Sequence, residues 1–128
     1  MKMRVLLAMA LAIAFPFPIA AQATGSTHKI TVTFNYDFTR TKACKAGLTK
    51  NCVQNFNVYD ISGGLKNRAK LMVIPVPPGA QGVKKGISGT TSPLIFEPGK
   101  HLLAVAAQTP QGVESDLRLC RVWVSIPQ

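Results

Sequence analysis

Residues 30–38 alternate strictly between apolar and polar side chains. Ile30, Val32, Phe34, Tyr36 and Phe38 take every second position, and polar residues stand between them. Because successive side chains of a β-strand point to opposite faces, this period of two predicts a strand with one buried face. A helix could not gather these residues on one side, so the pattern favours a β-sheet protein.

Further segments have strand character and are separated by turn signals. Residues 53–61 place Phe56 and Val58 on one face, and residues 69–76 form an apolar run that stops at two prolines. The inward faces of two more strands are predicted at residues 103–107 and 122–126. Leu94 and Phe96 predict another short strand, whereas residues 79–89, rich in Pro and Gly, predict an irregular crossing.

The chain after residue 23 shows no sustained helical spacing of apolar residues. Short strands with turns between them are typical of two packed sheets. We therefore expect an all-β domain, an antiparallel two-sheet sandwich of about seven strands.

The first 23 residues have the three parts of a secretory signal peptide. Lys2 and Arg4 precede an apolar run over residues 5–15, and Ala21-Gln22-Ala23 forms a small-residue cleavage pattern. We expect a signal helix that is cleaved after Ala23, leaving residues 24–128 as the domain. An uncleaved N-terminal anchor is the alternative, and the short apolar run disfavours it. The protein is thus expected to be secreted, periplasmic or in the cell envelope, with at most peripheral membrane contact.

The stretch PGKHLLAVAAQTPQGVESD, residues 98–116, resembles the sixth strand and following loop of fibronectin type III domains. Residues 53–59, VQNFNVY, are similar to the third strand of that family, and residues 30–34 to its second strand. The positions that fall in register are Gly99, Val105, Ala107, Gly112, Glu114 and Ser115. The resemblance implies an immunoglobulin-like sandwich that acts as a rigid spacer or a noncatalytic binding module.

Three cysteines in a chain expected to be exported predict one disulfide and one remaining thiol. Cys44, Cys52 and Cys120 allow three pairings. Cys44 and Cys52 are close in sequence and their disulfide is favoured, while the two pairings with Cys120 stay open. Cys120 shares its parity with the apolar residues of the last strand, and is interpreted as a buried, inert thiol.

The polar loop over residues 39–51 is the best candidate binding surface. Arg40, Lys42, Lys45 and Lys50 crowd this loop, and no acidic residue occurs between Asp37 and Asp60. The domain after residue 23 carries 13 basic and 5 acidic side chains, a net charge of +8, which favours anionic partners. A solvated loop without a ligand is the equally simple alternative.

Two residues near the C-terminus complete the predicted binding set. Arg118 precedes the last strand, at the end of the domain expected to hold the basic loop. Trp123 has the opposite parity to its apolar neighbours, so it is expected either to face outward, as a candidate anchor for a partner, or to cover the edge of the sheet. No nucleic acid is expected as a ligand, because no phosphate cradle or aromatic stacking platform accompanies the charge.

Catalytic and metal motifs are not recognisable in the sequence. His28 and His101 lack partners at zinc-ligand spacing, so no metal or cofactor is expected. Glu114 and Asp116 are close together but fit the loop pattern of the resemblance, and no nucleophile motif occurs. We therefore expect a noncatalytic binding or structural module for a protein or an anionic envelope polymer, of open oligomeric state. The alternatives are an accessory subunit that adds an edge strand, residues 71–76 or the last strand, to a partner, and, more distantly, a secreted hydrolase.

Overall fold

A computed structural model describes residues 20–24 and 27–127 of the chain. Residues 1–19, 25, 26 and 128 lie outside the described part, and with them most of the predicted signal peptide. Its last four residues are described, and they belong to the first strand of the fold, β1 (Ala20–Thr24).

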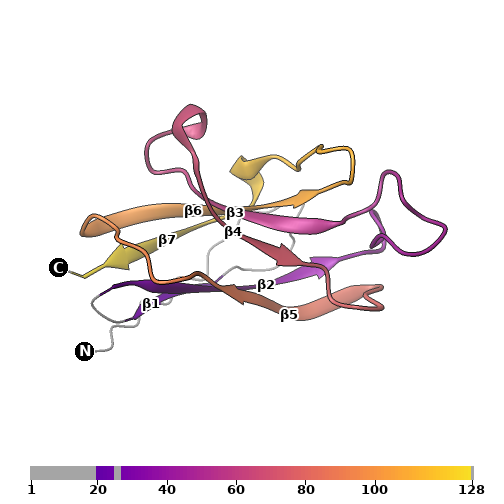
Figure 1. The fold of residues 1–128 in the computed structure, drawn as a ribbon, viewed down its shortest axis with the longest axis horizontal. Helices are drawn as coiled ribbons and strands as arrows, with labels where there is room; N and C mark the ends of the chain where they lie inside the picture. The colour runs from indigo at the N-terminus through magenta and orange to yellow at the C-terminus, as the bar shows by residue number, and fades with distance from the viewer. Residues whose placement is uncertain (1–19, 25–26, 128) are drawn as a thin grey trace.

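Within the described residues, seven strands form two sheets that face each other (Figure 1). The three-stranded sheet has the order β1-β2-β5. The four-stranded sheet has the order β4-β3-β6-β7, and every pairing in both sheets is antiparallel. The remaining strands are β2 (Lys29–Asp37), β3 (Asn55–Asp60), β4 (Ala69–Pro75), β5 (Val83–Thr90), β6 (Gly99–Gln108) and β7 (Arg121–Ile126).

Helix in this part of the chain is limited to two short 3-10 turns, η1 (Leu65–Asn67) and η2 (Leu117–Leu119). The predicted all-β, two-sheet architecture is therefore confirmed. The two sheets also come close at their margins, where β1 lies beside β7 and β4 beside β5. The loop between β2 and β3 and the turn between β4 and β5 project from the same end (Figure 1).

The core between the sheets is built on aromatic rings. Phe34 and Tyr36 of β2 meet Phe56 of β3 edge to face, with ring centroids 4.9 and 5.2 Å apart. Phe38 extends the cluster, 4.8 Å from Tyr36. Such contacts stabilise a fold by about 0.5–1.5 kcal/mol each beyond the burial of area. Because Phe38 directly precedes the long basic loop, the aromatic cluster supports the base of that loop.

A second, smaller cluster covers the outer face of the four-stranded sheet. Tyr59 of β3 and Ala104 and Ala106 of β6 face away from the main core and pack with Leu117 of η2. The segment between β6 and β7 therefore folds back over its own sheet. This placement brings Glu114 of that segment against β3.

β5 corrects the expectation of an irregular crossing over residues 79–89. Ile87 is the one buried side chain in this strand, so the sequence of β5 lacks the apolar alternation that would predict a strand. Gly89 allows β5 to approach β4, because a Cβ at that position would lie 2.6 Å from Cγ1 of Ile74. The strand forms because its backbone pairs with β2 over residues 83–90, a long-range partnership.

The short strand predicted at Leu94 and Phe96 is wrong. Leu94 makes only an isolated bridge, in which its N–H and that of His28 each donate to the other residue's carbonyl oxygen at 3.0 Å. The next strand begins at Gly99 instead. Phe96 packs against the main core from this irregular segment.

Candidate functional site

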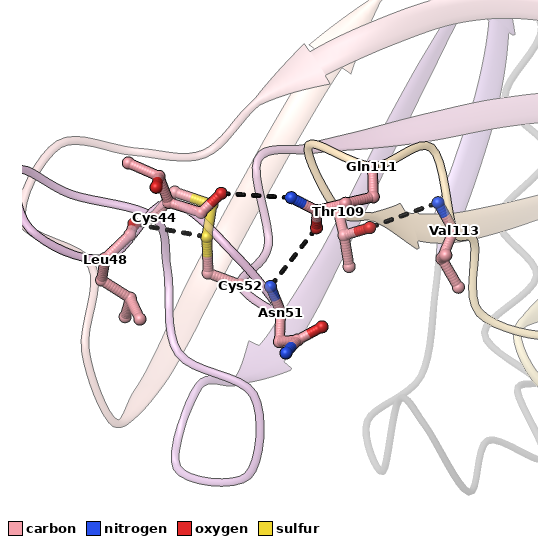
Figure 2. Close-up of a disulfide and its surroundings, with 8 residues drawn as sticks. Cys44, Leu48, Asn51, Cys52, Thr109, Gln111 and Val113 are labelled. Carbon is pink, nitrogen blue, oxygen red and sulfur yellow. Dashed lines mark hydrogen bonds between the residues drawn. A yellow bond between two sulfur atoms is a disulfide. The ribbon is translucent and has the colours of Figure 1, made fainter.

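A disulfide between Cys44 and Cys52 closes the loop that joins β2 to β3 (Figure 2). The favoured pairing is thus confirmed, and the two Cα atoms lie 5.0 Å apart. Inside the ring, the N–H groups of Lys45 and Leu48 each donate to the other residue's carbonyl oxygen, at 3.1 and 2.9 Å. The disulfide and this pair of hydrogen bonds fix the shape of the basic segment.

The same loop is tied to the loop between β6 and β7. The side-chain oxygen of Gln111 accepts from the N–H of Asn51, and its amide nitrogen donates to the carbonyl of Thr49, both at 3.4 Å (Figure 2). Asn51 has a left-handed backbone with φ of 53°, a conformation that asparagine tolerates better than most residues. The basic loop is therefore held at one side by a covalent bond and at the other by Gln111.

A cleft of about 880 Å³ lies between the basic loop and the segment that joins β4 to β5. Residues 42–45 line one side, and residues 76–82 line the other. Phe38 and Val53, both 2% exposed, contribute the core side of the lining. The N–H of Phe38 donates to the carbonyl of Gly82 at 2.7 Å, which joins the two walls directly.

The cleft lies at the basic end of the domain, a name we use for the surface around Arg40, Lys42, Lys45, Lys50, Lys84 and Lys85. Lys42 and Lys45 belong to the cleft lining, which contains no aspartate or glutamate. Lys84 and Lys85 join them because β5 begins beside the end of β2, with Lys84 opposite Tyr36. This end therefore presents a positive surface around a recess.

Asp37 is a carboxylate at the basic end, and it is engaged locally. Its oxygen accepts from the N–H of Thr39 at 2.9 Å. Hydrogen bonds from the side chain and the backbone of Thr39 lower the pKa of Asp37 below its usual value. The carboxylate thus caps the turn that starts the basic loop.

The structure brings only part of the predicted binding set together. Lys42 and Lys45 line the cleft, while Arg40 and Lys50 lie on the same loop outside the lining. Arg118 lies on η2 and forms an ion pair with Asp116 at 2.7 Å. The hydrogen bonds from Arg118 lower the pKa of Asp116 to about 2, so the charge of this arginine is already matched.

Trp123 has the outward orientation that its parity predicted. It stands on β7 opposite Leu102 and is 50% exposed. β7 is an edge strand of its sheet, as is β4, so both strand edges considered in the sequence are real edges. Trp123 does not belong to the cleft lining.

The sequence did not reveal the second wall of the cleft. The apolar run predicted over residues 69–76 stops at Pro77 and Pro78, and Gly79 begins the predicted irregular crossing. The structure places these three residues opposite Lys42 and Lys45. The Pro-Pro-Gly run signals a turn, but a turn signal does not say which distant loop it will face.

Cys120, the remaining cysteine, is a free thiol with no exposed surface. Burial raises its pKa to about 12. Since the thiolate is the reactive form, this side chain is inert in the folded protein. Its placement confirms the interpretation of a buried thiol that packs with the inward residues of β7.

Glu114 sits in a polar network on the outer face of the four-stranded sheet. Its Oε2 accepts from the hydroxyl of Tyr59 at 2.6 Å and from the side-chain amide of Asn57 at 2.7 Å. Asn57 is fully buried and also donates to Oε1 of Gln108 at 3.1 Å. Burial and the bond to Glu114 raise the pKa of Tyr59. The network therefore fastens the segment after β6 onto β3.

His101 forms a second polar cluster at the end opposite the cleft. Nδ1 of His101 lies 2.6 Å from Oδ2 of Asp60, and Nε2 lies 2.7 Å from the carbonyl oxygen of Glu97. Ser62 donates from its hydroxyl to Oδ1 of Asp60 at 2.6 Å and accepts from the N–H of Leu102. Burial opposes ionisation of Asp60, but the hydrogen bonds from Ser62 and His101 together lower its pKa.

This cluster has the residue types of a hydrolytic triad in the wrong order. In such a triad the histidine stands between the serine and the carboxylate and accepts the serine proton. Here Asp60 stands between Ser62 and His101, and both ring nitrogens of the histidine face other acceptors. The cluster acts as a clamp that joins the end of β3 to β6.

The described residues contain no group of three or more His, Cys, Asp or Glu side chains that could hold a metal ion. Among them there is also no helix of the length and apolar character needed to cross a membrane. Comparison with known proteins gives no match to a protein-family model, to a curated protein or to a solved structure. The function proposed below is therefore inferred from the sequence and the structure of the chain alone.

Proposed function

We propose that the protein is an exported, noncatalytic binding module of the fibronectin type III-like class, and that its basic end recognises an anionic partner. The observation that carries the proposal is the cleft, which has two lysines and no carboxylate in its lining and is held by a disulfide. A positive recess of this kind attracts anions and steers them to one place.

The strand order supports the fold-family part of the proposal. Immunoglobulin constant-type domains pack their first, second, fifth and fourth strands against the third, sixth and seventh. Here the same partition holds except that the fourth strand joins the third. Residues 98–116 are similar to the family's sixth strand and following loop, and β6 lies at the start of this stretch, at Gly99–Gln108.

Export is supported by the disulfide. Disulfides persist in oxidising compartments and are rare in the cytosol, and the Cys44–Cys52 bond closes a loop at the surface of the domain. The absence of catalysis is supported by the order of Ser62, Asp60 and His101, in which the histidine does not face the serine hydroxyl.

The test is retention of the protein on an immobilised anionic polysaccharide across a salt series. The double variant Lys42→Glu with Lys45→Glu reverses the charge of the cleft lining, and Lys66→Glu with Lys100→Glu is the matched control. The control alters two exposed lysines at the opposite end and changes the net charge equally. We expect wild type and control to be retained and to elute as salt rises, while the cleft variant is not retained. Equal loss in both variants would show that only net charge matters.

Edge-strand addition to a partner is a second candidate, and β7 favours it. Among the strands that the structure describes, β7 has a neighbour in its sheet on one side alone, and Trp123 on it is half exposed, as expected of an anchor. Binding through main-chain hydrogen bonds would not weaken with salt, unlike binding at the basic end. Trp123→Ala would then reduce capture of a partner without changing retention on the polymer.

A further inference from the structure

The lining of the cleft has apolar side chains beside its two lysines. Val76, Pro77, Pro78 and Ala80 form much of one wall, and Phe38 closes the core side. A fully hydrated polyanion gains little from such a wall, whereas a ligand with an apolar body gains about 25 cal/mol for each Å² it buries. The cleft can therefore bind a ligand through apolar contacts as well as through its two lysines.

The cleft is also preorganised. The N–H of Val53 donates to the carbonyl of Lys42 at 2.9 Å, and Phe38 donates to Gly82 at 2.7 Å, so each wall is tied to the core by the backbone. The disulfide fixes the wall that carries the lysines, and the proline pair stiffens the other. A ligand would order few groups on binding, which lowers the free-energy cost of binding.

We infer that the cleft binds a small organic acid, whose apolar body lies against residues 76–80 and whose carboxylate lies at Lys42 and Lys45. The volume of about 880 Å³ is within the range of small-molecule sites. Lysine supplies compact positive donors, and the absence of lining carboxylates leaves them available to an acid. The inference rests on the proposed function, because it uses the same two lysines, and it adds the class of ligand.

The probe is naphthalene-2-carboxylate, which is titrated into the protein while the amide chemical shifts are followed by NMR. Naphthalene-2-carboxamide has the same body without the charge, and acetate has the charge without the body. Lys42→Gln with Lys45→Gln removes the proposed contacts, and Lys66→Gln with Lys100→Gln is the matched control at the opposite end. All four lysines are exposed, so these variants are expected to fold.

We expect saturable shifts in residues 42–45 and 76–82, with an affinity for the carboxylate about tenfold above that for the carboxamide. The Lys42 and Lys45 variant should lose about the same factor, and the control should lose none. Absence of saturable shifts, equal binding of the carboxamide, binding of acetate as tight as that of the naphthoate, or equal loss in the control would each overturn the inference.

The two proposals fail in different ways. If the protein is retained on the polysaccharide through Lys42 and Lys45 but the naphthoate does not bind, the ligand class is wrong and anion recognition stands. If the naphthoate binds through the lysines but retention on the polysaccharide ignores them, the ligand class stands and polymer recognition is refuted.

Discussion

Replacing Glu114 by alanine tests whether the polar network on the outer face holds the segment after β6 in place. The change leaves the hydroxyl of Tyr59 without its acceptor, in a side chain that is 6% exposed. Stranding a buried polar group costs about 1–3 kcal/mol. Asn57 also loses its hydrogen bond to Glu114, and this loss adds about 1 kcal/mol to the cost because Asn57 keeps its bond to Gln108. The partly exposed contact with Arg68 at 3.9 Å adds little.

We therefore expect Glu114→Ala to lower the free energy of unfolding by about 3 kcal/mol. Glu114→Gln keeps an acceptor oxygen and should cost about 1 kcal/mol. Urea unfolding measures both, and Glu97→Ala, an exposed carboxylate, is the control that should change stability by less than about 0.5 kcal/mol.

A double-mutant cycle separates the network from general damage. Tyr59→Phe removes the stranded hydroxyl, so Glu114→Ala should cost about 2 kcal/mol less in the phenylalanine background than in the wild type. A cost for Glu114→Ala below about 1 kcal/mol, or the same cost in both backgrounds, would refute the reasoning.

Four further predictions concern other parts of the fold. Replacing Cys44 and Cys52 together by alanine should lower the free energy of unfolding by about 2.5 kcal/mol, since the bond spans 8 positions; a urea midpoint equal to that of the wild type would contradict this. The lowered pKa of Asp60 contributes stability above the unfolded value of 3.8, which is lost as the pH falls through the folded value; in acid titrations monitored by circular dichroism, Asp60→Asn should therefore lose less stability on acidification than the wild type. Cys120 should resist iodoacetamide in the folded protein, because its pKa is about 12, and should react fully in urea, as mass spectrometry would show. A chain that starts at Thr24 should exchange the β2 amides paired with β1 faster than a chain that starts at Ala20, and equal protection would show that β1 does not shield them.

The parts of the fold that could be predicted are those in which one strand alone carries the signal. β2 was evident because Ile30, Val32 and Phe34 alternate with polar residues and are all buried. β5 was not evident, because Ile87 is its one buried side chain and its pairing with β2 is set by tertiary contact. Local patterns report burial on one face, and a strand exposed on most of its length leaves no such pattern.

The same distinction holds for the candidate site. The basic loop and its disulfide could be predicted, because the charges and the two cysteines are close together in the sequence. The cleft could not, because its second wall comes from residues 76–82, which are brought to Lys42 by the long-range pairings of β4 with β3 and of β5 with β2. Arg118 was expected to contribute to the same site, but it forms an ion pair with Asp116, two residues away in the sequence.

The pairing of β1 with β2 links the N-terminal segment to the stability of the sandwich. Residues 20–24 pair with residues 29–33 of β2, whose inward side chains Ile30 and Val32 have no exposed surface. Cleavage after Ala23, the site that the sequence predicts, would remove four of the five residues of β1 and leave those backbone groups of β2 without this partner. A strand edge in that condition pairs readily with another extended segment. Cleavage at or before residue 19 would retain the whole strand and keep the edge of β2 covered. The position of cleavage would therefore decide whether the three-stranded sheet is completed by the chain itself.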